Sequence, residues 1–180
     1  MRLDLPVTQE RLNALRIGES YELFGDILTA RDAAHKRFKQ AIDANSPLPV
    51  EIERFAIFYT GPCPPRPGMV IGSIGATSSS RMDPFVLSML KAGNKIMIGK
   101  GARAPYVADL CREYKAVYLM VYGGAAALYS KCVKKAEIVC YEDLGAEAVR
   151  KLFVEDFKAI VAIDTEGSVL MDHCQKEYAR

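Results

Sequence analysis

Three short apolar segments, each followed by a turn and then by a helical pattern, constrain the fold of this chain more than any other feature. These segments are residues 69–75, 95–98 and 116–122. Apolar runs of this length are typical of strands buried on both faces of a parallel sheet. The helices expected after them are residues 84–90, 105–114 and 125–129. This alternation predicts an α/β fold with a buried parallel sheet.

Further strands are expected on either side of this alternation. The first six residues and residues 54–60 have β character, and residues 20–28 indicate short strands about a turn at Gly25. A helix is expected to begin at Thr29 as its N-cap and to end at residues 45–47. The proline-dense segment 61–68 predicts an extended surface loop. The end of the chain is expected to contain strands at 136–141, 158–163 and 168–171, with a hairpin turn at 164–167 and a polar tail at 172–180.

Length and charge exclude several classes of protein. A chain of 180 residues is expected to form a single domain, and its net charge of +2 is too small for a general nucleic-acid binder. No apolar run reaches the roughly 18 to 20 residues of a membrane span, and the acid at Asp4 is untypical of a signal peptide. We therefore expect a cytoplasmic protein with neither a nucleic-acid nor a membrane partner.

The metal-ligating residues form no recognisable motif. The five cysteines include no C-x-x-C pair, and the two histidines do not belong to an H-E-x-x-H sequence. Most of the cysteines are therefore expected to be reduced thiols in the core, and no metal site is expected in this chain.

The segment 75–83, with the sequence GATSSSRMD, is the most informative candidate site. Asp83 followed by Pro84 is expected to cap the next helix, so the hydroxyls of residues 77–80 are not needed for capping. Together with Arg81, which can bind a carboxylate through two parallel hydrogen bonds, they form a candidate carboxylate or phosphate pocket. The alternative is a tight turn beside a solvated Arg81.

A second candidate is the segment 98–104, with the sequence IGKGARA. Its two glycines let the backbone approach a ligand, and Lys100 presents an ammonium group. The segment also fits G-x-G-x-x-A, a variant of the dinucleotide-binding motif, but residues 122–124 lack the acid that would bind a ribose. A solvated lysine on a loop is the third interpretation.

A third candidate is the segment 31–35, with the sequence RDAAH. Arg31 in the first helical turn opposes the helix dipole, which indicates either a facing anion or a solvated arginine. Asp32 is expected to reach back to the cap at Thr29. His35 is expected to be a surface or hydrogen-bonded histidine rather than a catalyst.

Several of these segments resemble, in order and spacing, the β-type subunit of class I fumarate hydratase and L-tartrate dehydratase. The motifs are TARDAAHKR at 29–37, GPCP at 61–64, GATSSSRMD at 75–83, IGKG at 98–101 and EDLGAEA at 142–148. The family usually has P-T-T where this chain has Ala76-Thr77-Ser78.

The resemblance implies a swivelling β/β/α fold and an iron–sulfur hydro-lyase. The 4Fe–4S cluster would be held by three cysteines of an α-type subunit or N-terminal domain, and its iron would act as a Lewis acid on the departing hydroxyl. By the same resemblance, Arg31, Arg81 and Lys100 would bind the carboxylates of a four-carbon dicarboxylate, and Thr77 would be the base. A threonine hydroxyl is a poor base unless its surroundings lower its pKa.

The leading hypothesis is therefore a fumarate hydratase β subunit that works in a hetero-oligomer with an α-type partner. The alternative within the same chemistry is a tartrate dehydratase β subunit, because both substrates are dicarboxylates. A nucleotide-binding module that uses residues 99–104 and a non-catalytic interaction domain are the alternatives of other classes.

Overall fold

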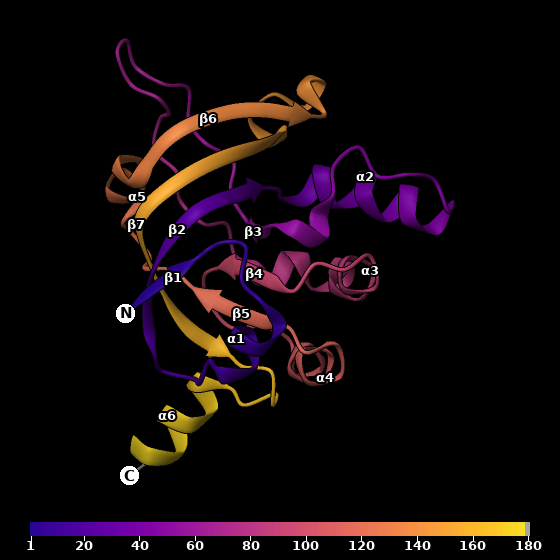
Figure 1. Cartoon of the computed structure of the whole chain (residues 1–180), viewed down its shortest axis with the longest axis vertical. Helices are drawn as coiled ribbons and strands as arrows, with labels where there is room; N and C mark the ends of the chain where they lie inside the picture. Colours follow the sequence, from indigo (N-terminus) through magenta and orange to yellow (C-terminus); the bar gives the residue numbers. More distant parts are fainter. Residues whose placement is uncertain (179–180) are drawn as a thin grey trace.

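The structure is a computed structural model and describes residues 1–178 (Figure 1). The strands are β1 (Arg2–Asp4), β2 (Ser20–Thr29), β3 (Ala56–Phe58), β4 (Ile96–Gly99), β5 (Val117–Met120), β6 (Val133–Cys140) and β7 (Val149–Ile163). The α-helices are α1 (Gln9–Ala14), α2 (Asp32–Asp43), α3 (Val86–Lys91), α4 (Pro105–Tyr114), α5 (Ala126–Cys132) and α6 (Leu170–Tyr178). Short 3-10 segments are η1 (Ile52–Arg54), η2 (Ser79–Phe85) and η3 (Glu142–Glu147).

The strands form one mixed sheet that closes on itself. Strands β1 to β5 are hydrogen-bonded in parallel in the order β1-β2-β3-β4-β5. The long strand β7 runs antiparallel to both β5 and β2, and β6 extends the sheet beyond β7. Because β7 pairs with both β2 and β5, the strands β2, β3, β4, β5 and β7 form a closed ring.

Alternating side chains divide the core into two clusters. Along β3, Ala56 and Phe58 belong to the cluster inside the ring, whereas Ile57 belongs to the cluster outside it. The same alternation along β5 places Leu119 inside and Tyr118 outside. Side chains in a strand point to opposite faces in turn, so strands that are apolar at every position are buried on both faces. This burial is the reason that the sequence shows continuous apolar runs.

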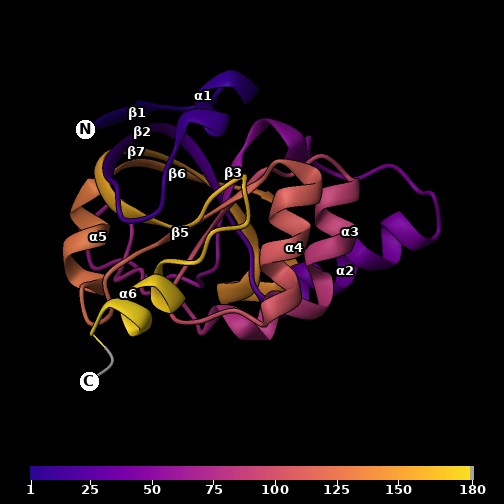
Figure 2. The same ribbon diagram turned by 90° about the horizontal axis from the view of Figure 1, so that it is seen from below.

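The outer cluster is covered by helices. Figures 1 and 2 show α2, α3 and α4 side by side on the outer face of the strands, with α5 on another side of the molecule. Helix α2 contributes Ala34 and Phe38 to the outer cluster, and α4 contributes Val107 and Cys111. The α/β class expected from the sequence is confirmed. None of the helices in residues 1–178 is long and apolar enough to cross a membrane.

Most of the predicted elements are present, and α4 has the predicted bounds. The expected strand at 69–75 is wrong: this segment is a loop in which Ile71 and Ile74 cover the inner cluster. The expected turn within residues 20–28 is also wrong, because β2 is one strand with a register shift between Leu23 and Gly25. The predicted proline-dense loop at 61–68 is confirmed.

The expected end of the chain is only partly correct. The turn at 164–167 forms, with the Gly167 N–H donating to the Asp164 carbonyl at 3.0 Å. The expected strand at 168–171 is wrong, because only a single bridge from Ile163 to Val169 precedes α6. The expected polar tail is helical over residues 172–178, and residues 179–180 lie outside the described residues.

The expected N-cap at Thr29 is wrong as well. Thr29 is the last residue of β2, and its hydroxyl accepts a hydrogen bond from the Arg150 N–H at 3.1 Å. Helix α2 begins after Arg31, and Asp32 therefore does not reach back to a threonine cap. Instead, the Glu147 carboxylate accepts from the Ala33 N–H at 2.8 Å and satisfies one of the free N–H groups of the first turn.

Candidate active site

The predicted site residues follow the carboxyl ends of neighbouring strands. Strands β2, β3 and β4 are parallel, so their carboxyl ends share one edge of the sheet. Arg31 follows the end of β2, and Lys100 directly follows the end of β4. Loops at the carboxyl ends of parallel strands commonly bind ligands, in closed as well as in open α/β sheets. The topology therefore places two of the predicted cations at a position suited to binding.

The loop that carries Thr77 lies across the ends of β3 and β4. The Thr77 N–H donates to the Tyr59 carbonyl at 2.8 Å, just after β3. Ser78 and Lys100 form a parallel bridge, and the Ser79 N–H donates to the Lys100 carbonyl at 3.1 Å. These bonds place Thr77 and Lys100 on adjacent, mutually bonded segments.

Arg31 and Arg81 are joined by a shared carboxylate. The Arg81 Nη2 lies 2.8 Å from Asp32 Oδ1, and the Arg31 Nε lies 3.2 Å from Asp32 Oδ2. The Arg31 Nε is also 3.6 Å from a carboxylate oxygen of Glu147. Residues from β2's end, from η2 and from η3 thus meet in one ion-pair network.

Close packing at Gly61 supports this network. A Cβ at Gly61 would lie only 2.8 Å from the Ala146 carbonyl and 3.2 Å from Arg31 Cδ. Glycine therefore permits the proline-dense loop to pass between Arg31 and the segment that bears Glu147. The three segments that carry the first, second and last motifs of the sequence resemblance meet here.

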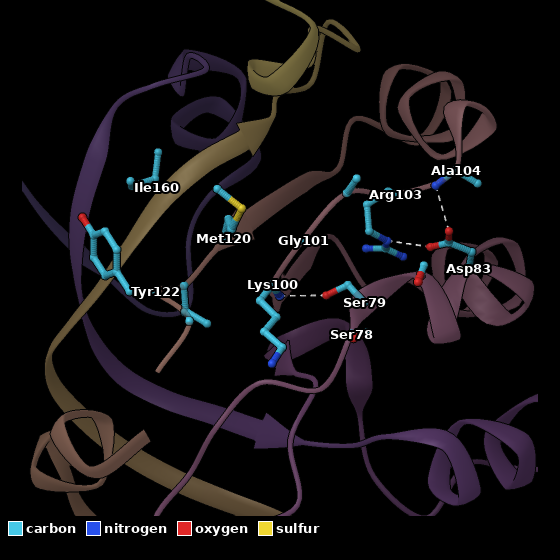
Figure 3. A pocket seen from close by; sticks show the side chains of 14 residues that line it. Ser78, Ser79, Asp83, Lys100, Gly101, Arg103, Ala104, Met120, Tyr122 and Ile160 are labelled. Carbon is cyan, nitrogen blue, oxygen red and sulfur yellow. Dashed lines mark hydrogen bonds and ion pairs between the residues drawn. The ribbon is translucent and has the colours of Figure 1, made fainter. Parts of the chain in front are cut away.

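An open cavity of about 760 Å³ lies beside Lys100 (Figure 3). Of the four residues that the resemblance assigns to the site, Lys100 lines the cavity, whereas Thr77, Arg31 and Arg81 do not. The hydroxyl residues Ser78, Ser79 and Ser80, also expected at the site, line it as well. Its other walls come from residues that follow β4 and β5, from the start of η2 and from β7. They include Ser78, Ser80, Ala102, Met120, Tyr122 and Ile160. The structure therefore brings these four residues to one edge of the sheet, as the pair Arg31 and Arg81 and the pair Thr77 and Lys100. Of the four, only Lys100 lines the cavity.

The sequence predicted that Asp83 caps the next helix, but Asp83 does not cap α3. Helix α3 follows Phe85 with no side-chain cap, and the Asp83 carboxylate is buried. Its Oδ1 accepts from Arg103 Nε at 2.6 Å, and its Oδ2 accepts from the Ala104 N–H at 2.8 Å. This ion pair was not predicted, because Asp-Pro before an apolar run has the pattern of a helix start. The one sequence feature that pointed to Arg103 is its position in the segment 98–104, which also contains Lys100.

His35 is buried and hydrogen-bonded, which is one of the two expected alternatives; it does not lie at the surface. Its Nδ1 is 3.1 Å from the Arg31 carbonyl, and its ring meets the Tyr59 ring edge to face. Burial lowers the pKa of His35 to about 4, so the imidazole is neutral at pH 7. The expectation for Asp32 is wrong, since its carboxylate holds the two arginines.

The cysteines are more exposed than the sequence analysis expected. Cys111 is the one fully buried cysteine, whereas Cys63 and Cys174 are exposed. No group of three His, Cys, Asp or Glu side chains in residues 1–178 is arranged to hold a metal ion. The cysteine thiols of the described part of the chain therefore do not provide a three-thiolate ligand set for a cluster.

Comparison with known proteins identifies the family of this chain. The sequence profile of the fumarase C-terminus matches residues 1–174. The chain belongs to the fumarase C-terminal family. The sequence resemblance described above is thereby confirmed.

Relatives of two kinds share this fumarase C-terminal sequence. The anaerobic class I fumarate hydratase of Escherichia coli is 38% identical over 88% of this chain, and mitochondrial fumarate hydratase 1 of Leishmania major is 36% identical over 91%. The β subunit of Escherichia coli L(+)-tartrate dehydratase is 32% identical over 98% of this chain and 89% of its own length. The chain spans only 29% and 30% of the two fumarate hydratases.

Proposed function

We propose that residues 1–180 form the single domain of an iron–sulfur hydro-lyase β subunit, which hydrates fumarate reversibly to L-malate in the cytoplasm. Activity requires an α-type partner, a proposal supported by the match with a relative named as the β subunit of L(+)-tartrate dehydratase. The observation that carries the proposal is the gathering of Arg31, Arg81, Lys100 and Thr77 at one edge of the sheet, in a chain of the fumarase C-terminal family.

The three cations are assigned to the two carboxylates of the substrate. Arg81 has a guanidinium that can bind one carboxylate through two parallel hydrogen bonds, and its side chain is 52% exposed. Asp32 holds Arg81 and Arg31 together, so both can act on the same end of a dicarboxylate. The Lys100 ammonium forms no ion pair with any residue in the described chain, and its position at the cavity suits the other end.

Thr77 is assigned the transfer of a proton. In the dehydration direction Thr77 Oγ1 first gives its own proton to a base of the assembled enzyme, and the resulting alkoxide takes the proton from the carbon beside one carboxylate. In the hydration direction the hydroxyl returns that proton to the carbon, and the base restores the hydroxyl proton. The Thr77 N–H bond to the Tyr59 carbonyl fixes the backbone that carries this hydroxyl. Among the described residues, no side chain is hydrogen-bonded to Thr77 Oγ1. The base that activates this hydroxyl is therefore assigned to a group that reaches Thr77 only when the α-type partner is bound.

The 4Fe–4S cluster is assigned to the α-type partner. The residues of this chain do not fit such a group, because the five thiols are spread over the fold without a shared site. The contribution of this chain is therefore to bind and orient the substrate.

A second candidate is L-tartrate dehydration. It is favoured by one observation: the match with the tartrate dehydratase β subunit covers 98% of this chain and 89% of that subunit. Tartrate carries one more hydroxyl than malate, and Ser78 and Ser80 at the cavity are hydroxyls that could bond it.

The test is anaerobic co-expression of the chain with a candidate α-type subunit, followed by co-purification and assays with fumarate and tartrate. Fumarate turnover by the complex, and none by this chain alone, is the expected result. A preference for tartrate supports the second candidate, and a stable iron-loaded complex with neither activity contradicts both.

A further inference from the structure

Arg103 and Asp83 form a buried ion pair between the two segments that carry Arg81 and Lys100. The side chains are 1% and 6% exposed, and Arg103 Nε lies 2.6 Å from Asp83 Oδ1. Asp83 is two residues after Arg81 in η2, and Arg103 is three residues after Lys100 in the loop that leads to α4. A buried pair of this kind has a fixed geometry, because either charge alone would be strongly destabilised.

The pair also fixes the backbone of the Lys100 loop. The second oxygen of Asp83 accepts from the Ala104 N–H at 2.8 Å, so the carboxylate binds both the side chain and the backbone of this loop (Figure 3). The guanidinium carbon of Arg103 lies 4.8 Å from the centre of the Tyr118 ring and 5.4 Å from that of Tyr59. Contacts with both rings hold the guanidinium in place.

Tyr118 extends this contact to Lys100 itself. Its hydroxyl is 3.0 Å from both Ser79 Oγ and the Gly101 carbonyl. Ser79 Oγ in turn accepts from the Lys100 N–H at 2.9 Å. A chain of contacts therefore leads from the Arg103 guanidinium to the backbone of Lys100.

We infer that Arg103 and Asp83 are a positioning pair that fixes Lys100 relative to Arg81, and thereby sets the distance between the cations that bind the two ends of the substrate. This inference rests on the proposed roles of Lys100 and Arg81. Arg103 has no contact with the substrate in this scheme, and it acts through the loop it holds. Asp83 lies in the segment of Arg81, and Arg103 lies in the segment of Lys100. Loss of their ion pair therefore displaces Lys100 relative to Arg81 without removing the charge of either residue.

The principal variant is Arg103→Lys, which keeps the positive charge beside Asp83 but loses the planar guanidinium that lies between the tyrosine rings. Its matched control is Arg112→Lys in α4, the helix that follows the Arg103 loop, where an exposed arginine lies 2.6 Å from Asp109. Tyr118→Phe is the second variant, because it removes the hydroxyl link to Ser79 and keeps the ring. If Arg103→Lys fails to fold, Tyr118→Phe carries the test.

The first readout is hydrogen exchange of the full chain in complex with its α-type partner, followed by mass spectrometry. We expect faster exchange in residues 98–104 and 77–83 for Arg103→Lys and Tyr118→Phe, and unchanged exchange in both segments for Arg112→Lys. Unchanged exchange in these segments for both test variants would overturn the inference. This readout does not depend on turnover, so it separates the inference from a failure of the proposed function.

The second readout is a double-mutant cycle with Lys100→Met in the active complex. Arg103→Lys is expected to lower kcat/KM about 10- to 100-fold, as small displacements of positioned groups do. In the Lys100→Met background the same change is expected to have little further effect, because the residue it positions is gone. Independent, multiplicative losses would contradict an action through Lys100.

Discussion

Removal of the Arg81 side chain is expected to lower activity strongly and stability only slightly. Its side chain is about half exposed and forms one ion pair, with Asp32, so Arg81→Ala should lower the free energy of unfolding by less than about 1 kcal/mol. The loss of a two-bond contact with a carboxylate is expected to lower kcat/KM by about 100-fold or more in the assembled enzyme. Steady-state kinetics and urea unfolding of the same preparation measure the two effects.

The control for Arg81→Ala is Arg54→Ala. Arg54 is also exposed and forms one ion pair, 2.8 Å from Glu51, but it lies away from the carboxyl edge of the sheet. Its removal should leave both kinetics and stability unchanged. Wild-type rates in the Arg81 variant would contradict the assignment of Arg81 to the substrate.

His35 gives the fold a dependence on pH. Burial lowers its pKa from 6.5 to about 4. The unfolded chain therefore binds a proton below about pH 6.5 that the folded chain excludes until about pH 4, and the stability falls as the pH falls through this window. We expect a loss of about 2 kcal/mol between pH 7 and pH 5. Urea unfolding at these two pH values measures it.

His35→Gln should remove most of this pH dependence, whatever its effect on stability at pH 7. His173→Gln is the matched control, because His173 is exposed on α6 and its loss should leave the pH dependence of the wild type in place. An undiminished loss of stability in His35→Gln would show that other groups cause it.

At the scale of elements, β2 depends on the glycine at its register shift. Gly25 has a φ of +123°, and a Cβ there would lie 2.7 Å from the Leu5 carbonyl. Gly25→Ala therefore combines backbone strain with a clash against the segment after β1. We expect it to lower the free energy of unfolding by about 2 kcal/mol or more.

Gly68→Ala is the control that measures the cost of the left-handed backbone conformation alone. Gly68 also has a positive φ, of +81°, but nothing lies within 4 Å of a Cβ there. It should cost about 1 kcal/mol, as expected for a left-handed residue without a clash. Equal losses for the two variants in thermal or urea unfolding would mean that Leu5 moves away without cost.

The sequence predicted those elements whose signals are local. Helix α4 has Pro105 as its first residue and an amphipathic pattern, so both its start and its length could be predicted. Residues 69–75 were misinterpreted because Ile71 and Ile74 are apolar for a non-local reason, as they cover the interior of the ring. Residues 168–171 carry too little local signal to distinguish one β-bridge from the start of a helix.

The site shows the same division. The segments that carry Arg31 and Lys100 could be placed after strands from the sequence, because the apolar patterns of β2 and β4 are local. The strand expected before the Arg81 segment, at 69–75, is a loop. The pairing of Asp83 with Arg103 could not be predicted, since it joins residues 20 positions apart and the Asp-Pro pair has a sufficient local explanation as a cap. Contacts of this kind depend on packing that a single sequence does not specify.

At the scale of the molecule, the ring of strands explains how one short chain presents several loops together. Strand β7 closes the ring by pairing with both β2 and β5, which fixes the relative positions of the strands that carry the site. The inner face of the ring is filled by the inner cluster, and the outer face is covered by helices. The loops that present functional side chains therefore lie at the carboxyl edge of the strands. The proposed function uses this edge to present substrate-binding cations toward a partner that supplies the cluster.

This arrangement predicts that a defective chain competes with the wild type. The Arg81→Ala chain keeps its fold and its surface, so it should still bind the α-type partner and occupy it in an inactive complex. Adding it in increasing amounts to a mixture of partner and wild-type chain, before assembly, should lower fumarate hydration in proportion to its share of the total β chain. The Arg54→Ala chain added in the same way should leave the rate unchanged. If the Arg81→Ala chain leaves the rate unchanged, either it does not bind the partner or the two chains do not form one active site, and co-purification of the variant distinguishes these outcomes.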